Sequence, residues 1–299
     1  MTAEQNGAPV DPYKAQLRAT WDGLGPAWQR WQDFFERGAK PVTDWMVNAV
    51  RVATGDRVLD VATGAGEPAL TVADLVGPTG RVVGIDQSPK MVEAARNRAE
   101  GRDNTTFRVD DVDQLDAETG SGYDVVLSRF GLMFAQDLPK ALVALAGVLN
   151  SGGHCAIAAW SVPPRAPIVS LGFGVAARKL ELPPPPPQTP GPFSMADPEP
   201  VLDALRKAGF VDVRAQEVQT TFQAASVDEF IDYCQATLPG WLAARLAERF
   251  GTDRGNSVWS EIAEAVAPYV QPDGQVALPS IAVCFAGRRP SPITSSLRR

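Results

Sequence analysis

Short apolar runs alternate with longer amphipathic segments between residues 57 and 160 of the chain. The runs predict strands at residues 57–62, 81–86, 105–109, 123–128 and 154–160. The segments between them predict helices at residues 67–76, 89–99 and 138–149. Regular alternation of strand and helix is typical of a parallel sheet with helices on both faces. We therefore expect an α/β fold with a doubly wound sheet.

The pattern changes after residue 160. Five consecutive prolines at residues 183–187 fit neither a helix nor a central strand, so we interpret them as a stiff, extended connector. The rest of the chain predicts helices at residues 168–180, 197–208, 228–250 and 258–270. It also predicts strands at residues 210–218 and 275–287.

The segment ahead of the first strand, residues 13–52, has a helical pattern and is rich in aromatic residues. Trp21, Trp28 and Trp31 all precede the first strand. Two interpretations remain open for these rings. They form a helical layer packed on the sheet, or they cover a ligand beyond the strand ends and close over it as a lid.

A glycine turn connects the first strand to the following helix. Gly64 and Gly66 allow a sharp turn and a close approach of the backbone to a ligand, because no Cβ is in the way. Together with Ala69 they satisfy the G-x-G-x-x-A spacing of dinucleotide sites. Asp86 ends the next strand, where an acid can accept hydrogen bonds from both hydroxyls of a ribose.

Composition excludes several classes of protein. A formal charge of −7 leaves no basic surface for phosphates, so we expect no nucleic-acid partner. No apolar run is long enough to span a bilayer, and the polar N-terminus does not suggest a signal peptide. Cys155, Cys234 and Cys284 are interpreted as buried thiols of a cytoplasmic protein, and their spacing suggests no metal site.

Asp60, Gly64-x-Gly66, Asp86 and Asp111-Val112 together resemble the class I S-adenosylmethionine-dependent methyltransferases. The similarity is greatest to the branch with the ubiquinone/menaquinone biosynthesis methyltransferases and related small-molecule methyltransferases. It covers residues 21–160 and more loosely the C-terminal part. The chain departs from the family at Ala62, where a glycine is usual.

The resemblance implies a Rossmann-like, seven-stranded, mostly parallel sheet whose last strand is antiparallel and lies between the previous two. Residues 13–287 then form one domain with disordered tails at residues 1–12 and 288–299. Residues 13–52 are its helical cap, and residues 161–200 and 226–271 are lid insertions on the substrate side.

The resemblance also implies roles for single residues. Asp86 takes the ribose hydroxyls, and Asp111 accepts from the adenine amino group. Asp60 holds the turn or the ligand's ammonium group. Trp28, seven residues after Trp21-Asp22, faces the sulfonium. The expected cofactor contacts are Trp28, Asp60, Ala62, Gly64, Gly66, Asp86, Gln87, Met91, Asp111, Val112, Ser128 and Arg129.

The implied activity is in-line methyl transfer from S-adenosylmethionine to a small acceptor, which we expect to be an aromatic or other apolar metabolite. Such a transfer needs alignment more than a protein base, and we name no catalytic residue. His154 is rejected because it begins a strand and so lies away from the cofactor. Candidates for the substrate wall are Tyr13, Arg129, Trp160, Glu229 and Tyr233.

Two alternatives remain. An NAD(P)-dependent oxidoreductase is compatible with the glycine spacing and with Asp86. A non-catalytic cofactor-binding scaffold is compatible with every motif. The sequence predicts neither the oligomeric state nor the methylated atom.

Overall fold

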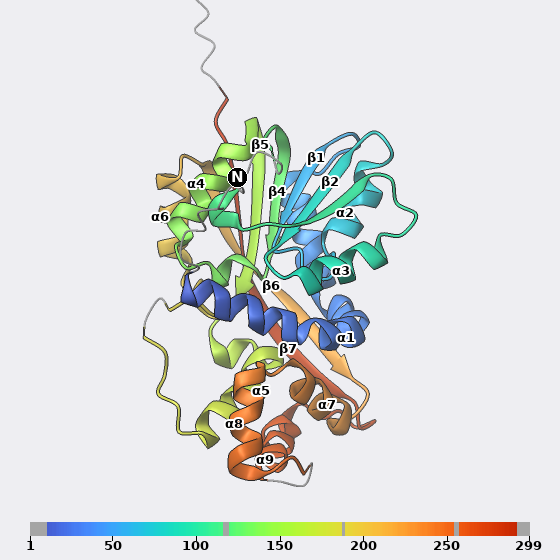
Figure 1. Ribbon diagram of the computed structural model, residues 1–299, viewed down its shortest axis with the longest axis vertical. Helices are drawn as coiled ribbons and strands as arrows, with labels where there is room; N and C mark the ends of the chain where they lie inside the picture. The colour runs from blue at the N-terminus through green and yellow to red at the C-terminus, as the bar shows by residue number, and fades with distance from the viewer. Residues whose placement is uncertain (1–10, 116–119, 187–188, 254–256, 292–299) are drawn as a thin grey trace, which may run out of the picture.

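A seven-stranded sheet forms the centre of the protein. The computed structural model describes residues 11–115, 120–186, 189–253 and 257–291. Within them the strand order is β3-β2-β1-β4-β5-β7-β6 (Figure 1). The strands are β1 Arg57–Val61, β2 Arg81–Asp86, β3 Thr105–Val109, β4 Tyr123–Arg129, β5 Leu149–Trp160, β6 Val211–Ala224 and β7 Val276–Arg288.

The predicted topology is confirmed. Strands β1 to β5 pair in parallel, and β7 is antiparallel to both β5 and β6, between which it lies. The dinucleotide-binding order 3-2-1-4-5-6 has no strand inserted in this way. The topology therefore disfavours the oxidoreductase alternative.

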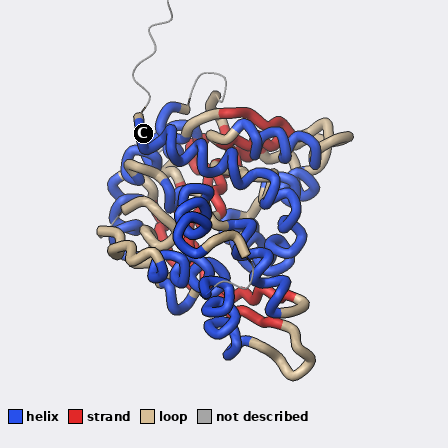
Figure 2. Tube along the Cα trace, turned by 60° about the horizontal axis from the view of Figure 1, so that its bottom comes forward, coloured by secondary structure: helices blue, strands red, loops and turns tan. Residues whose placement is uncertain are grey.

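Helices enclose the strands, as the tube in Figure 2 shows. They are α1 Pro12–Val50, α2 Ala69–Val76, α3 Pro89–Arg98, α4 Leu138–Val148, α5 Pro167–Lys179, α6 Pro198–Lys207, α7 Val227–Thr237, α8 Gly240–Phe250 and α9 Ser257–Val266. Val42 and Met46 of α1 share a buried apolar cluster with residues of α2 and α3. Leu145 of α4 and Leu205 of α6 belong to a second buried cluster.

Helix α1 has two parts that differ in burial. All of its buried residues lie from Leu24 onward, and none lies between Pro12 and Gly23. Phe34 and Phe35 pack against Phe222 of β6 with their rings tilted by 42° and 39°, so the rear part of α1 belongs to the core. The predicted helical cap is thus a single long helix whose front part alone is peripheral.

Strand β6 is longer than expected, because it continues to Ala224 beneath α1. Its buried residues alternate there, and they include Phe222 and Thr220, whose hydroxyl donates to the Gly38 carbonyl of α1. Strand β5 begins earlier than predicted. Helix α4 ends at Val148, and residues 150–153, which lie between the predicted helix and the predicted strand, form an irregularity in the pairing of β4 with β5.

The two insertions contribute helices at the far end of the β6–β7 hairpin. In Figure 1, α1 crosses the middle of the view, with most of the sheet above it and α5, α7, α8 and α9 below. Of the disordered tails predicted at residues 1–12 and 288–299, residues 1–10 and 292–299 lie outside the described residues, as do Pro187 and Gln188. The prediction is wrong at the inner ends of the tails, because Pro12 begins α1 and Arg288 ends β7. Prolines 183–186 belong to no helix or strand.

None of the helices in the described ranges is both long and apolar enough to cross a membrane. Cys155, Cys234 and Cys284 are unpaired and buried, as predicted. Burial raises the pKa of Cys155 and of Cys284 to about 12, so both thiols stay protonated at neutral pH.

His154 lies at the edge of the sheet opposite the strand ends that carry the glycine turn. It pairs with Val125 and Arg288, whereas Trp160, at the other end of β5, stacks on Phe130. Burial and nearby arginines, Arg288 first among them, lower the pKa of His154, so it is neutral at pH 7.

We expect His154→Gln to retain most of the methyl-transfer activity that the sequence predicts, because the imidazole lies at the sheet edge opposite the glycine turn. Steady-state kinetics of wild type and variant are the measurement. A loss of about a thousandfold in kcat, with cofactor affinity unchanged, would contradict this placement.

Candidate active site

The carboxyl ends of β1, β2, β3 and β4 open into one cavity, which the front part of α1 covers. Most of the predicted contacts line it: Trp28, Ala62, Gly64, Asp86, Gln87, Met91, Asp111, Val112 and Arg129. Ligands of open α/β sheets bind at this edge of the sheet. Asp60, Gly66 and Ser128 do not line the cavity and lie behind its wall.

The turn after β1 has positive φ angles at its two glycines, a conformation that favours glycine. Gly64 and Gly66 have φ values of 54° and 103°. Ala62 has φ 56°, which is uncommon for a residue with a side chain. A Cβ at Gly131 would collide with the Ala62 methyl group, so the glycine at position 131 makes room for the alanine at position 62.

Asp60 organises the turn from behind. Its Oδ2 accepts hydrogen bonds from the Thr63 hydroxyl (2.6 Å) and the Ala69 N–H (3.2 Å), and the residue is fully buried. The free N–H groups at the start of a helix favour an anionic group, and Asp60 occupies this position at the start of α2.

Asp86 is held at the cavity wall by two backbone donors. The Gly64 N–H donates to Oδ2 and the Ser88 N–H to Oδ1, each at 2.9 Å. Each carboxylate oxygen can accept a further hydrogen bond, so Asp86 can receive two hydroxyl groups. Ser88 caps α3 by accepting a hydrogen bond from the Met91 N–H, and it donates its hydroxyl to Asp22 of α1 (2.6 Å).

Asp111 has a partner that the sequence did not reveal. Lys14 of α1 lies 2.6 Å from Asp111 Oδ2 and 2.7 Å from Asp113 Oδ2. Tyr13 also donates its hydroxyl to the Phe134 carbonyl (2.9 Å). The front part of α1 is thereby tied across the end of the cavity formed by β3.

Aromatic rings form the middle of the wall. Trp28 packs edge-on against Phe35, with ring centroids 4.8 Å apart, and its Nε1 is buried with no partner among the described residues. Of the candidates for the substrate wall, Tyr13 and Arg129 line the cavity. Trp160 and Tyr233 are buried in the core, and Glu229 caps the start of α7.

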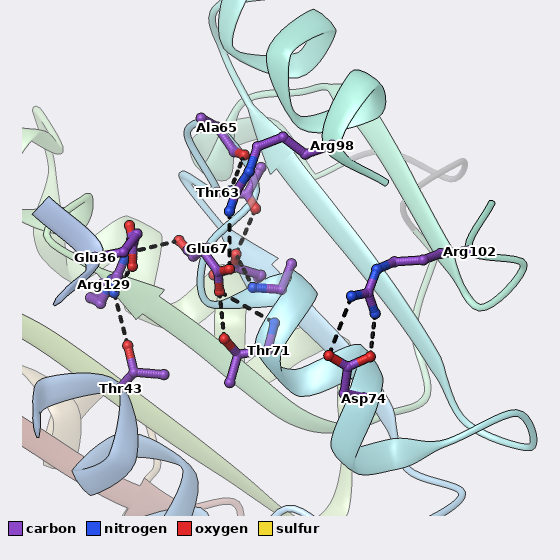
Figure 3. Close-up of polar contacts among 12 residues, drawn as sticks. Glu36, Thr43, Thr63, Ala65, Glu67, Thr71, Asp74, Arg98, Arg102 and Arg129 are labelled. Carbon is purple, nitrogen blue, oxygen red and sulfur yellow. Dashed lines mark hydrogen bonds and ion pairs between the residues drawn. The ribbon is translucent and has the colours of Figure 1, made fainter. Parts of the chain in front are cut away.

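Sequence reasoning missed a group of charged residues at the turn end of the cavity: Glu36, Glu67 and Arg98. Figure 3 shows Glu36 and Thr43 of α1 bonded to Arg129 at the end of β4. Arg98 binds the Ala65 carbonyl (2.7 Å) and the Glu67 carboxylate (3.3 Å). The helical periodicity of α1 could have predicted Glu36. The cavity is lined from this helix by Trp21, Trp28, Gln32, Phe35 and Glu36.

The residues fit S-adenosylmethionine. Asp86 and Asp111 form a polar end suited to a nucleoside, and the aromatic rings form a wall suited to a sulfonium cation. Two donors at the wall, Trp28 Nε1 and Arg129 Nε, are buried without a partner among the described residues. Within those residues, no cluster of His, Cys, Asp and Glu could hold a metal ion.

The free energy of unfolding that Asp60 and Asp86 contribute decreases as the pH rises. Burial raises the pKa of Asp60 to about 7 and of Asp86 to about 6, from an ordinary value of 3.8. The folded protein therefore binds protons that the unfolded chain has released, and this contribution is present at low pH and lost as the pH rises through 6 to 7.

We expect the free energy of unfolding of wild type, relative to Asp86→Asn, to decrease from about pH 4 to about pH 6. The slope is at most about 1.4 kcal/mol per pH unit. Urea unfolding of both proteins across this range gives the difference. A difference that is constant with pH would show that Asp86 is ionised throughout.

Comparisons with known proteins agree with this site. Residues 53–171 match a family model described as a methyltransferase domain. Aklanonic acid methyltransferase DauC of Streptomyces sp. (strain C5) is 32% identical over 151 residues, which are 48% of this chain and 64% of the relative. Demethylmenaquinone methyltransferase of Clavibacter sepedonicus is 32% identical over 161 residues, which are 53% of this chain and 63% of the relative. The chain thus spans just under two thirds of the length of these relatives.

Solved structures share the fold. The [4+2]-cyclase SpnF aligns with a TM-score of 0.58 at 20% identity, over 96% of this chain and 100% of that one. Phosphoethanolamine N-methyltransferase 2 of Haemonchus contortus, in complex with S-adenosyl-L-methionine, aligns with a TM-score of 0.57 at 17% identity, over 95% of this chain and 61% of that one. Sheet order, turn, cavity residues and sequence similarity agree, and residues 53–171 of the chain match a methyltransferase domain.

Proposed function

We propose that the protein transfers the methyl group of S-adenosylmethionine to a small acceptor with an aromatic, uncharged ring. The observation that carries the proposal is a single cavity lined by both Asp86 and the glycine turn on one side and by the aromatic face of α1 on the other. The side with Asp86 and the glycine turn is suited to the cofactor. The aromatic side is suited to an apolar acceptor beside it.

In this proposal Asp86 and Asp111 fix the nucleoside, and Trp28 faces the sulfonium. Bound S-adenosylmethionine supplies an electrophilic methyl group. The protein's contribution is to align that methyl group with the acceptor, about 3 Å from the nucleophile, and to exclude water. The aromatic wall also favours the cation by about 1–2 kcal/mol when it is desolvated.

No residue at the described wall is proposed as a general base. Tyr13 donates its hydroxyl to a carbonyl, and burial raises its pKa to about 12, so it is a poor proton acceptor at neutral pH. His154 is at the opposite edge of the sheet. We therefore infer that the acceptor brings its own nucleophilic atom, as a phenol, quinol or enol does after losing a proton to water.

The proposed acceptor class follows from the wall beside the turn. The apolar surface there comes from four uncharged side chains: Leu17, Trp21, Leu132 and Phe134. The relatives named above act, by their names, on aklanonic acid and demethylmenaquinone. The chain's net charge of −7 and its unpaired cysteines support a small-molecule partner and a reducing compartment such as the cytoplasm.

Turnover with methyl-labelled S-adenosylmethionine and a panel of phenols, hydroquinones and naphthoquinols tests the proposal. We expect label in at least one ring-bearing acceptor and none in a matched panel of aliphatic amines and carboxylic acids. Because the same fold also carries a [4+2]-cyclase, the fold alone does not establish methyl transfer. Cofactor binding without transfer to any acceptor would favour the non-catalytic scaffold.

A further inference from the structure

We propose that Glu36 of α1 binds the α-ammonium group at the amino-acid end of the cofactor, with Arg129 as the positioning residue for the Glu36 carboxylate. The inference rests on the proposed function, because a nucleoside ligand without an amino-acid end brings no such group. It replaces Asp60, which the sequence suggested for this role and which lies behind the turn, outside the cavity.

Glu36 is selected by comparing the carboxylates that line the cavity. Asp110, Asp111 and Asp113 belong to the end formed by β3, away from the turn after β1. Asp86 contacts the turn, but each of its oxygens already accepts from a backbone N–H, and its remaining acceptor sites are assigned to the ribose. Glu67 lies at the turn, but Thr71 donates twice to its Oε2 (2.7 and 3.2 Å), and Arg98 binds its Oε1. These contacts direct the Glu67 carboxylate toward α2 and α3.

Glu36 is held beside the same turn by a two-pronged ion pair. Arg129 Nη1 lies 2.7 Å from Oε2 and Nη2 lies 2.6 Å from Oε1, and Nη1 also donates to Thr43 Oγ1 (2.8 Å). The Arg129 side chain is only 4% exposed, whereas that of Glu36 is 26% exposed. The cation is thus buried behind the anion, and the carboxylate is the part of the pair that a ligand can reach.

The accessible carboxylate of the pair suits an ammonium group. Each Glu36 oxygen accepts one hydrogen bond from Arg129 and can accept another from an ammonium donor. Because the guanidinium is buried behind the carboxylate, an approaching ammonium group meets the negative end of the pair first.

The test compares two ligands that share a nucleoside. S-adenosylhomocysteine carries the amino-acid end, and 5′-methylthioadenosine lacks it. By calorimetry we expect Glu36→Gln to weaken binding of S-adenosylhomocysteine about tenfold to a hundredfold and to leave methylthioadenosine within about twofold, because only the charged hydrogen bond is lost. Asp33→Asn, at an exposed position of the same helix, controls for the loss of one negative charge and should change neither affinity.

The outcomes separate the inference from the function on which it rests. If Glu36→Gln loses affinity equally for both ligands, or loses affinity for neither, the role of Glu36 is overturned and the proposed function stands. Wild type that binds neither ligand overturns both. If Glu36→Gln does not fold, Glu36→Asp replaces it in the test. Its carboxylate is charged but one methylene shorter, and it must show the same selective loss of affinity for S-adenosylhomocysteine.

Discussion

Replacing Asp86 by alanine is expected to weaken binding of S-adenosylhomocysteine by about 2–4 kcal/mol, which is roughly thirtyfold to a thousandfold. The side chain is held by the Gly64 and Ser88 N–H groups, so that both oxygens stay in place at the cavity wall. Two ribose hydroxyls would each donate to this carboxylate, and a hydrogen bond to a charged group contributes about 1.5–3 kcal/mol. Calorimetric titration gives the affinity.

The alanine variant also leaves two backbone N–H groups without their acceptor, so its fold must be checked by thermal unfolding. Asp86→Asn is the matched control, since it retains one acceptor oxygen and the side-chain shape. We expect an intermediate loss of affinity for it. A folded Asp86→Ala variant with unchanged affinity would show that the ribose binds elsewhere.

Deleting residues 1–22 is expected to reduce cofactor affinity by about tenfold or more while leaving the folded core intact. Within the deleted part, Tyr13, Lys14, Leu17 and Trp21 line the cavity, and none is buried in the core. The buried residues of α1 begin at Leu24. Because the lost contacts are at the surface of the core, we expect the free energy of unfolding to change by only about 1 kcal/mol.

Amide hydrogen exchange on the intact protein tests the same division of α1. Protection of Pro12–Gly23 should rise when S-adenosylhomocysteine is added, because the ligand provides contacts that this part lacks. Trp31 and Phe35 should be protected with and without ligand, since both are buried. Equal protection of the front part in both states would show that it is a fixed element and no lid.

Local patterns were sufficient to predict most of the fold. The apolar runs predicted β1 to β5, and Gly64, Gly66 and Asp86 could be placed at strand ends, because these features depend on residues close together in sequence. Thr220 of β6 was missed because its environment is created by α1, 182 residues away in the sequence. No local pattern contains such a contact.

The same limit applies to the site. Glu36 and Arg129 are 93 residues apart, and Lys14 and Asp111 are 97 apart. Both pairs exist because one helix crosses the ends of several strands. The sequence showed which acids lie at strand ends, but it did not show that Asp60 turns inward or that Lys14 already binds Asp111.

The most direct test of the account is calorimetric titration of the wild-type protein with S-adenosylhomocysteine and, separately, with NADH. Asp86 and the glycine turn are compatible with either ligand, whereas the inserted strand β7, the aromatic face of α1 and the charged pair at the turn favour the first. We predict saturable binding of S-adenosylhomocysteine at one site per chain and no binding of NADH. Binding of NADH without binding of S-adenosylhomocysteine would contradict the account.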